Sequence, residues 1–217
     1  HNIIMNSLVV LFFASNVLAA ALLGGKFIRK NDPVLKYFGI GLLFDALAFL
    51  MWTIGYVNSG QLLNFVTFGA IAFLVSLAIF LFASLQRVSA SARLGITVLG
   101  IVAIIAIFFV GRHSVNLAYI SPEGLLFFNL TPLVQLLYIF ALSFTFVPLI
   151  DLVASKFDGG YSALVKYGFI AQLVGGIMLI TSKDVQVLYI VGWVIGTIYL
   201  ILCLTLLFSR KAWLKVA

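Results

Sequence analysis

The sequence predicts an all-α bundle of seven transmembrane helices, and three observations support that prediction. Of the 217 residues, 64% are hydrophobic and only 9% are charged, whereas a soluble domain carries about 25% charged residues. The apolar residues gather into seven long runs separated by short polar segments. Most runs reach the length of about 20 residues with which a helix crosses a hydrocarbon core of about 30 Å. We therefore expect one integral membrane domain over residues 1–217.

The expected spans follow the apolar runs in order along the chain. Pro33 opens the second run, and the turn Asn58-Ser59-Gly60 closes it. Pro132 and Pro148 lie in the fifth run, so its regular part is expected to be shorter or kinked. The seven expected spans are residues 3–25, 33–57, 62–85, 94–110, 126–152, 163–181 and 185–208.

The distribution of basic residues predicts the orientation of the bundle. Lysine and arginine concentrate in cytoplasmic loops. With the N-terminus outside, the inner segments hold eleven of the 13 basic residues and the outer segments hold two, Arg112 and Lys183. We therefore expect a cytoplasmic C-terminus, in a prokaryotic cytoplasmic membrane. This bias also accounts for the net charge of +7, so the expected partner is the lipid bilayer and not nucleic acid.

Asp45 lies at the centre of the second span, where Lys36 at the start is the only other charge. A mid-membrane carboxylate costs about 2.5–3.5 kcal/mol on insertion and usually faces a partner or a polar cavity. Gly41, Asp45, Ala48 and Trp52 share one helical face, and small residues mark a face that packs on other helices. We expect Asp45 to face inward. It is either a proton, ion or ligand site or a hydrogen-bonded carboxyl that locks two helices together.

Polar and aromatic residues on other spans can complete a site around Asp45. The fifth span carries a polar seam of Thr131, Gln135, Tyr138, Leu142 and Thr145, which is read either as a solute path or as interhelical hydrogen bonding. Trp193 lies between Gly192 and Gly196, a GxxxG pattern that favours helix packing. The candidate binding residues are Asp45, Gln135, Tyr138, Gln172, Trp193 and Asn16.

Several functional classes are disfavoured by residues that the sequence lacks. The chain has two histidines, His1 and His113, and one cysteine, Cys203, so it offers no intrachain disulfide and no expected metal or haem site. No lysine lies between Val185 and Phe208, which argues against a retinal pigment. No paired carboxylates or nucleophile–base spacing appear, so we expect neither an enzyme nor a cofactor.

Two similar segments suggest an internal repeat. Residues 34–40 read VLKYFGI and residues 164–170 read LVKYGFI, and each segment is followed by a run that opens QLL or QVL. This is either a parallel duplication of three plus one plus three spans, a construction known among transporters, or a chance match between apolar segments. The alignment places Gly175 opposite Asp45.

The leading hypothesis is a small transporter or channel-like protein with a polar site for a solute or ion around Asp45. Two alternatives remain open. One is a seven-helix sensor or receptor module that signals through a partner, because residues 44–56 (FDALAFLMWTIGY) resemble the seven-span sensor regions of bacterial receptor kinases. The other is a non-catalytic subunit of a larger membrane complex. The candidate protein partners are therefore another membrane protein or a second copy of the chain.

Overall fold

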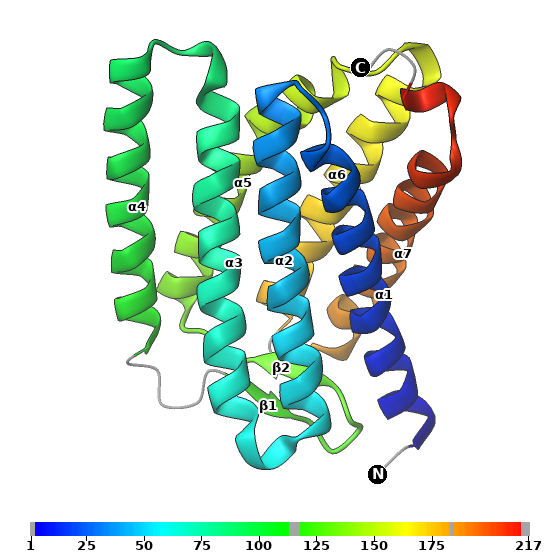
Figure 1. The fold of residues 1–217 in the computed structure, drawn as a ribbon. Helices are drawn as coiled ribbons and strands as arrows, with labels where there is room; N and C mark the ends of the chain where they lie inside the picture. The colour runs from blue at the N-terminus through cyan, green and yellow to red at the C-terminus, as the bar shows by residue number, and fades with distance from the viewer. Residues whose placement is uncertain (1–2, 113–117, 183–184, 214–217) are drawn as a thin grey trace.

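The computed structural model describes residues 3–112, 118–182 and 185–213, and seven of its helices are long and apolar enough to cross a membrane. These helices run roughly side by side (Figure 1) and indicate a membrane protein. Their bounds are α1 (Ile3–Ile28), α2 (Pro33–Val57), α3 (Leu62–Ser84), α4 (Ala90–Arg112), α5 (Pro132–Ala154), α6 (Gly159–Thr181) and α7 (Gln186–Phe208). Short 3-10 turns lie at Ser59–Gln61, Leu85–Arg87 and Lys211–Trp213.

The two ends of the bundle differ in charge. The α1–α2, α3–α4 and α5–α6 connections and the segment after α7 lie at one end, which we call the basic end (Figure 1). The α2–α3 and α4–α5 connections lie at the other end, which we call the hairpin end. Lys183 and the side chain of Arg112 lie outside the described residues. The lysines and arginines at or near the basic end are Lys26, Arg29, Lys30, Lys36, Arg87, Arg93, Lys156, Lys166, Arg210 and Lys211.

Six helices form a ring, and α4 lies outside it. Helix α2 packs along α1 and α3, and α6 packs along α5 and α7. Contacts between α3 and α5 and between α1 and α7 join these two groups of three. Helix α4 contacts α3 and α5 and leaves most of its surface exposed (Figure 1). The interior of the bundle is therefore built by the six ring helices.

Glycines allow close approach between neighbouring helices in both groups. A Cβ atom added to Gly39 of α2 would lie 2.7 Å from the Gly24 carbonyl oxygen of α1. A Cβ atom on Gly175 of α6 would lie 3.3 Å from the Gly192 carbonyl oxygen of α7. The Gly192/Gly196 pattern thus serves helix packing, and a Cβ on Gly196 would meet the Phe12 ring at 2.9 Å.

A β-hairpin precedes α5, where the sequence predicts helix from residue 126. Strands β1 (Ala118–Ile120) and β2 (Leu126–Phe128) pair antiparallel. Helix α5 starts only at Pro132 because proline suits the first helical turn, whereas the residue before it is biased away from helical geometry. The Thr131 side chain caps the helix by accepting a hydrogen bond from the Val134 backbone N–H at 3.4 Å. The apolar stretch before Pro132 is therefore available for a strand.

Other helix bounds extend past the apolar runs. Helix α4 covers 90–112 where the run covers 94–110, and α6 begins at Gly159 where the run begins at 163. Hydrophobicity marks the part of a helix that suits hydrocarbon, while backbone hydrogen bonding continues into the polar flanks. The spans read from hydropathy for α4 and α6 are therefore shorter than the helices that contain them.

Candidate functional site

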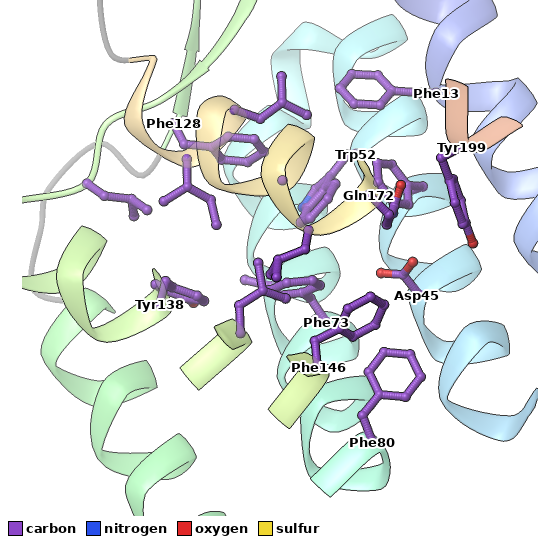
Figure 2. Close-up of a pocket in the computed structure, with 18 of the residues that line it drawn as sticks. Phe13, Asp45, Trp52, Phe73, Phe80, Phe128, Tyr138, Phe146, Gln172 and Tyr199 are labelled. Carbon is purple, nitrogen blue, oxygen red and sulfur yellow. The ribbon is translucent and has the colours of Figure 1, made fainter. Parts of the chain in front are cut away.

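A cavity of about 110 Å³ lies inside the ring, and all six ring helices contribute to its wall. A buried site needs at least about 10–15 Å³ to hold one water, and an apolar cavity of about 150 Å³ binds benzene. The cavity thus has room for a small organic molecule. Figure 2 shows its lining side chains converging from several helices and from β2.

Aromatic side chains dominate the wall of this cavity. Edge-to-face contacts connect them, with 5.2 Å between the ring centroids of Phe49 and Trp52 and 5.3 Å between those of Phe80 and Phe146. Such contacts fix ring positions and are worth about 0.5–1.5 kcal/mol beyond area burial. The wall is therefore rigid and apolar. Its aromatic residues include Phe49, Trp52, Phe73, Phe80, Tyr138 and Phe146.

Asp45 is the only charged residue among the described residues that line the cavity. It lies at the centre of α2 (Pro33–Val57), roughly 18 Å along the helix from either end. The residue is 7% exposed, and the described part of the chain gives its side chain no hydrogen bond and no ion pair. Leu43 and Leu47, on the opposite face of α2, are exposed. The structure therefore buries the face that the small-residue spacing assigned to the interior.

Two polar side chains lie beside Asp45 on the same side of the cavity. Gln172 comes from α6 and Tyr199 from α7, while Tyr138 and Phe128 lie across from them (Figure 2). Tyr199 is 1% exposed, interacts electrostatically with Asp45, and has no described nitrogen or oxygen atom as a hydrogen-bond partner for its hydroxyl. The cavity thus has a polar side, which we define as Asp45, Gln172 and Tyr199, and an aromatic side.

Three of the six residues singled out from the sequence line the cavity, namely Asp45, Tyr138 and Gln172. The other three lie elsewhere. The Asn16 side-chain amide donates to the Phe12 carbonyl oxygen at 2.9 Å on its own helix. Trp193 stacks on the Phe12 ring at 5.4 Å between centroids, and Gln135 is partly buried on α5 outside the described lining.

Tyr199 was missed as a site residue by sequence reasoning. It lies on the same helical stripe as Gly192 and Gly196, whose spacing favours helix packing. The signal that could have found it is its mid-helix position on the face that meets the other helices. The aromatic wall was missed for a different reason: the chain has 21 phenylalanines, and their sequence positions do not distinguish cavity rings from core rings.

The β-hairpin packs against the cavity wall at the hairpin end and contributes Phe128 to its lining. The Tyr56 hydroxyl donates to the Gly124 carbonyl oxygen at 2.5 Å, which ties α2 to the hairpin loop. Gly124 has φ of 90°, a conformation that residues with a side chain rarely adopt. The Phe127 ring packs on Tyr189 at 5.3 Å, and Phe128 packs on Trp52 at 5.2 Å. The hairpin is therefore fastened to α2 and to α7 beside the cavity.

An aromatic cluster closes the basic end. We call Phe27, Phe157 and Trp213 the inner aromatic cluster; the Trp213 ring lies 5.2 Å from Phe27 and 5.6 Å from Phe157 between centroids. Trp213 Nε1 donates to the Leu206 carbonyl oxygen at 2.5 Å. Lys26 Nζ lies 4.2 Å from the centroid of the Trp213 ring, a cation–π contact. The segment after α7 is thus fastened to α1 and to the α5–α6 connection.

An ion pair between Asp32 and Lys156 joins the α1–α2 and α5–α6 connections at the same end. Both side chains are about a quarter exposed. Partial burial raises the pKa of Asp32, but hydrogen bonds from Lys156 and from the backbone N–H groups of Leu35 and Val34 outweigh burial and bring that pKa below its usual value. Asp32 also caps α2. Asp32 and Lys156 of these two connections are therefore paired with each other.

Within the residues that the structure describes, no group of three or more histidine, cysteine, aspartate or glutamate side chains could hold a metal ion. The chain matches no family model, no curated protein and no solved structure. The polar side chains that line the cavity are one carboxyl (Asp45), one amide (Gln172) and the phenols of Tyr138, Tyr189 and Tyr199.

Proposed function

We propose that the protein is a small membrane carrier that binds an organic solute in the central cavity, with Asp45 as its polar anchor. The observation that supports this most is the buried Asp45 carboxylate, which has no described partner and faces a cavity of molecular size. A buried charge that serves only to hold helices together needs a donor or a cation. A polar group of a bound solute can supply that partner.

A carrier fits the cavity better than an open channel or an enzyme does. The cavity is central, as solute sites of membrane carriers are. The hairpin packs against its wall at one end and the inner aromatic cluster lies at the other. In our proposal the structure represents a closed state, and movement of one group of three helices against the other exposes the cavity to each side in turn.

The repeat hypothesis agrees with the origin of the polar side. Asp45 belongs to the group α1–α3, whereas Gln172 and Tyr199 belong to the group α5–α7. In each group the middle helix packs along both neighbours. We propose that the two groups derive from a parallel duplication with α4 as the linker. The solute then binds between the repeats, as in other carriers built this way.

We also propose that the basic end faces the cytoplasm of a prokaryotic cell and that the N-terminus lies outside. The gathering of lysine and arginine at one end supports this orientation.

Cysteine labelling tests this orientation. Cys203 is the only cysteine and is buried, so the wild-type chain should react little with a maleimide. In intact cells a membrane-impermeant maleimide should label Ser59→Cys and should label Asn31→Cys only after permeabilisation. The reverse pattern would contradict the orientation.

Two glycine substitutions test the carrier proposal in proteoliposomes. Gly176 lines the cavity, and a Cβ atom there would first meet Leu142 Cδ2 at 3.6 Å, so Gly176→Leu places atoms in the void. A Cβ atom on Gly95 of α4 would meet no described atom within 4 Å, so Gly95→Leu is the matched control. The assay measures uptake of a labelled amine, amino acid and sugar.

We expect saturable uptake of at least one of these solutes by the wild type and Gly95→Leu, and its loss in Gly176→Leu. Equal uptake by all three proteins would contradict a route through the cavity.

A sensor module is the second candidate, favoured by the fastening of the C-terminal segment to α1 through Trp213. Probe binding that Gly176→Leu abolishes, without flux above protein-free liposomes, would identify a sensor.

A further inference from the structure

The charge and hydrogen-bonding character of the cavity define which ligand complements it. No lysine, arginine or histidine lies among its described lining residues, so an anion would find no cationic partner there. A hard divalent cation takes six or more oxygen ligands, more than the carboxyl, amide and phenol of the polar side provide. The single carboxyl in the lining is that of Asp45, which has no described partner and is negative when ionised. The partner that would favour its ionised form is one positive charge on an organic body.

We propose that the ligand of this cavity is a small primary amine, bound as its ammonium ion with the nitrogen at the polar side and the hydrocarbon against the aromatic side. This inference rests on the proposed solute site and names its substrate class. An ammonium group carries three N–H donors. The Asp45 carboxylate, the Gln172 amide oxygen and the Tyr199 hydroxyl oxygen can each accept one, and they come from three helices around one side of the cavity (Figure 2).

The aromatic side supports the same ligand class. A cation within about 6 Å of a ring centroid is attracted to the face of the ring, more strongly when both are desolvated. Phe80 and Phe146 lie near Asp45 in Figure 2 and line the cavity. The hydrocarbon body then fills the space toward Tyr138 and Phe128. Because the cavity of about 110 Å³ is smaller than the roughly 150 Å³ that binds benzene, that body is small.

Three probes of nearly the same shape separate charge recognition from filling of the cavity. n-Propylamine is cationic, 1-propanol is neutral and propanoate is anionic. Their dissociation constants are measured by calorimetry on the purified full chain in lipid nanodiscs. We expect the amine to bind at least about tenfold more tightly than the alcohol, because a hydrogen bond to a charged group is stronger than one between neutral groups. The carboxylate should not bind detectably.

Substitutions of Asp45 assign the selectivity to its charge. Asp45→Asn should weaken amine binding by about ten- to a hundredfold and change alcohol binding by less than about threefold. Asp45→Glu restores the charge and should recover the preference for the amine. Asp151→Asn is the matched control, because it is the same substitution at a side chain that is 67% exposed. It should bind like the wild type.

The outcomes separate this inference from the proposed site. Equal binding of amine and alcohol, or an amine affinity that Asp45→Asn leaves unchanged, overturns the amine inference and leaves a cavity site in place. Absence of amine binding to the wild type also overturns it. Unchanged amine binding in Gly176→Leu places the amine elsewhere and overturns the cavity site itself.

Discussion

The polar groups beside the central cavity and those at the basic end of the bundle differ in whether they have hydrogen-bond or ion-pair partners. At the basic end, Asp32 pairs with Lys156, and Lys26 Nζ donates to the Leu207 carbonyl oxygen at 2.8 Å. The Ser209 hydroxyl also donates to the Tyr161 hydroxyl oxygen at 2.7 Å. In the middle, Asp45 and the Tyr199 hydroxyl have no such partner among the described residues. The two polar groups beside the cavity therefore lack the partners that these basic-end groups have, although other buried polar side chains such as Asn16 are hydrogen-bonded within their own helix.

That difference indicates what each region is for. Leaving a polar group unpaired is most costly in a low-dielectric interior. Selection for stability alone would favour an apolar residue at position 45, because well-packed apolar residues often replace buried charges at no loss. The basic end therefore fastens the fold, and we propose that the carboxyl beside the cavity is retained for a ligand. Substitutions at the two regions should differ accordingly.

The largest loss of stability is expected from Trp213→Ala at the basic end. Trp213 is buried in the inner aromatic cluster, and its removal leaves a cavity beside Phe27 and Phe157. Truncation of a buried tryptophan costs about 3–5 kcal/mol. Trp213→Phe keeps a ring and loses the hydrogen bond to Leu206, for about 1 kcal/mol. Denaturant unfolding in detergent measures both, and equal effects would contradict a packing role.

A gain of stability is expected from filling part of the central cavity. Gly176→Leu and Gly95→Leu both gain about 1 kcal/mol from replacing glycine inside a helix. Only Gly176→Leu also fills part of the cavity, so it should exceed the control by about 1 kcal/mol in the same assay. A Gly176→Leu protein that is less stable than Gly95→Leu would mean that the wall cannot accept the added side chain.

A smaller effect is expected from Asp32→Asn. Asparagine still caps α2, so the change removes mainly the partly exposed pair with Lys156, worth about 0.2–1 kcal/mol at neutral pH. Because the folded-state pKa of Asp32 is lowered, its contribution is present above the unfolded value of about 4 and is lost as pH falls through the lower folded value. The stability difference from the wild type should therefore vanish in acid. A difference that is independent of pH would contradict the pairing.

The smallest effect is expected from Asp151→Asn. The Lys166 and Asp151 side chains are 48% and 67% exposed, and exposed ion pairs contribute little. The free energy of unfolding should change by less than about 0.5 kcal/mol. A larger loss would show that charges near this end of the bundle interact as a network.

The sequence predicts the helices well because the signal for a membrane span is cumulative over about 20 residues. It also predicts which face of α2 is buried, since the spacing of Gly41, Asp45 and Ala48 defines a face. The hairpin was not predicted, because residues 126–130 are as apolar as the start of a membrane helix. Only Pro132 marks the change from strand β2 to helix α5. Hydropathy measures whether a residue avoids water and not which backbone conformation it takes.

The candidate site was predictable only in part, for a related reason. A charge inside an apolar span is rare enough to identify Asp45 from its position alone. Tyr199 and Gln172 become site residues only because α6 and α7 bring them beside α2, and pairing between distant helices is not encoded in local spacing. Gln135 and Asn16 have equally polar side chains and lie outside the cavity lining.

The central claim is that Asp45 is kept for a ligand and not for stability. The most direct measurement is the Tm of the wild type and Asp45→Asn in detergent, each with and without saturating n-propylamine. We predict that Asp45→Asn alone has a Tm equal to or above that of the wild type, and that the amine raises the Tm of the wild type only. A variant that melts several degrees lower and keeps the full amine-induced rise would contradict the claim.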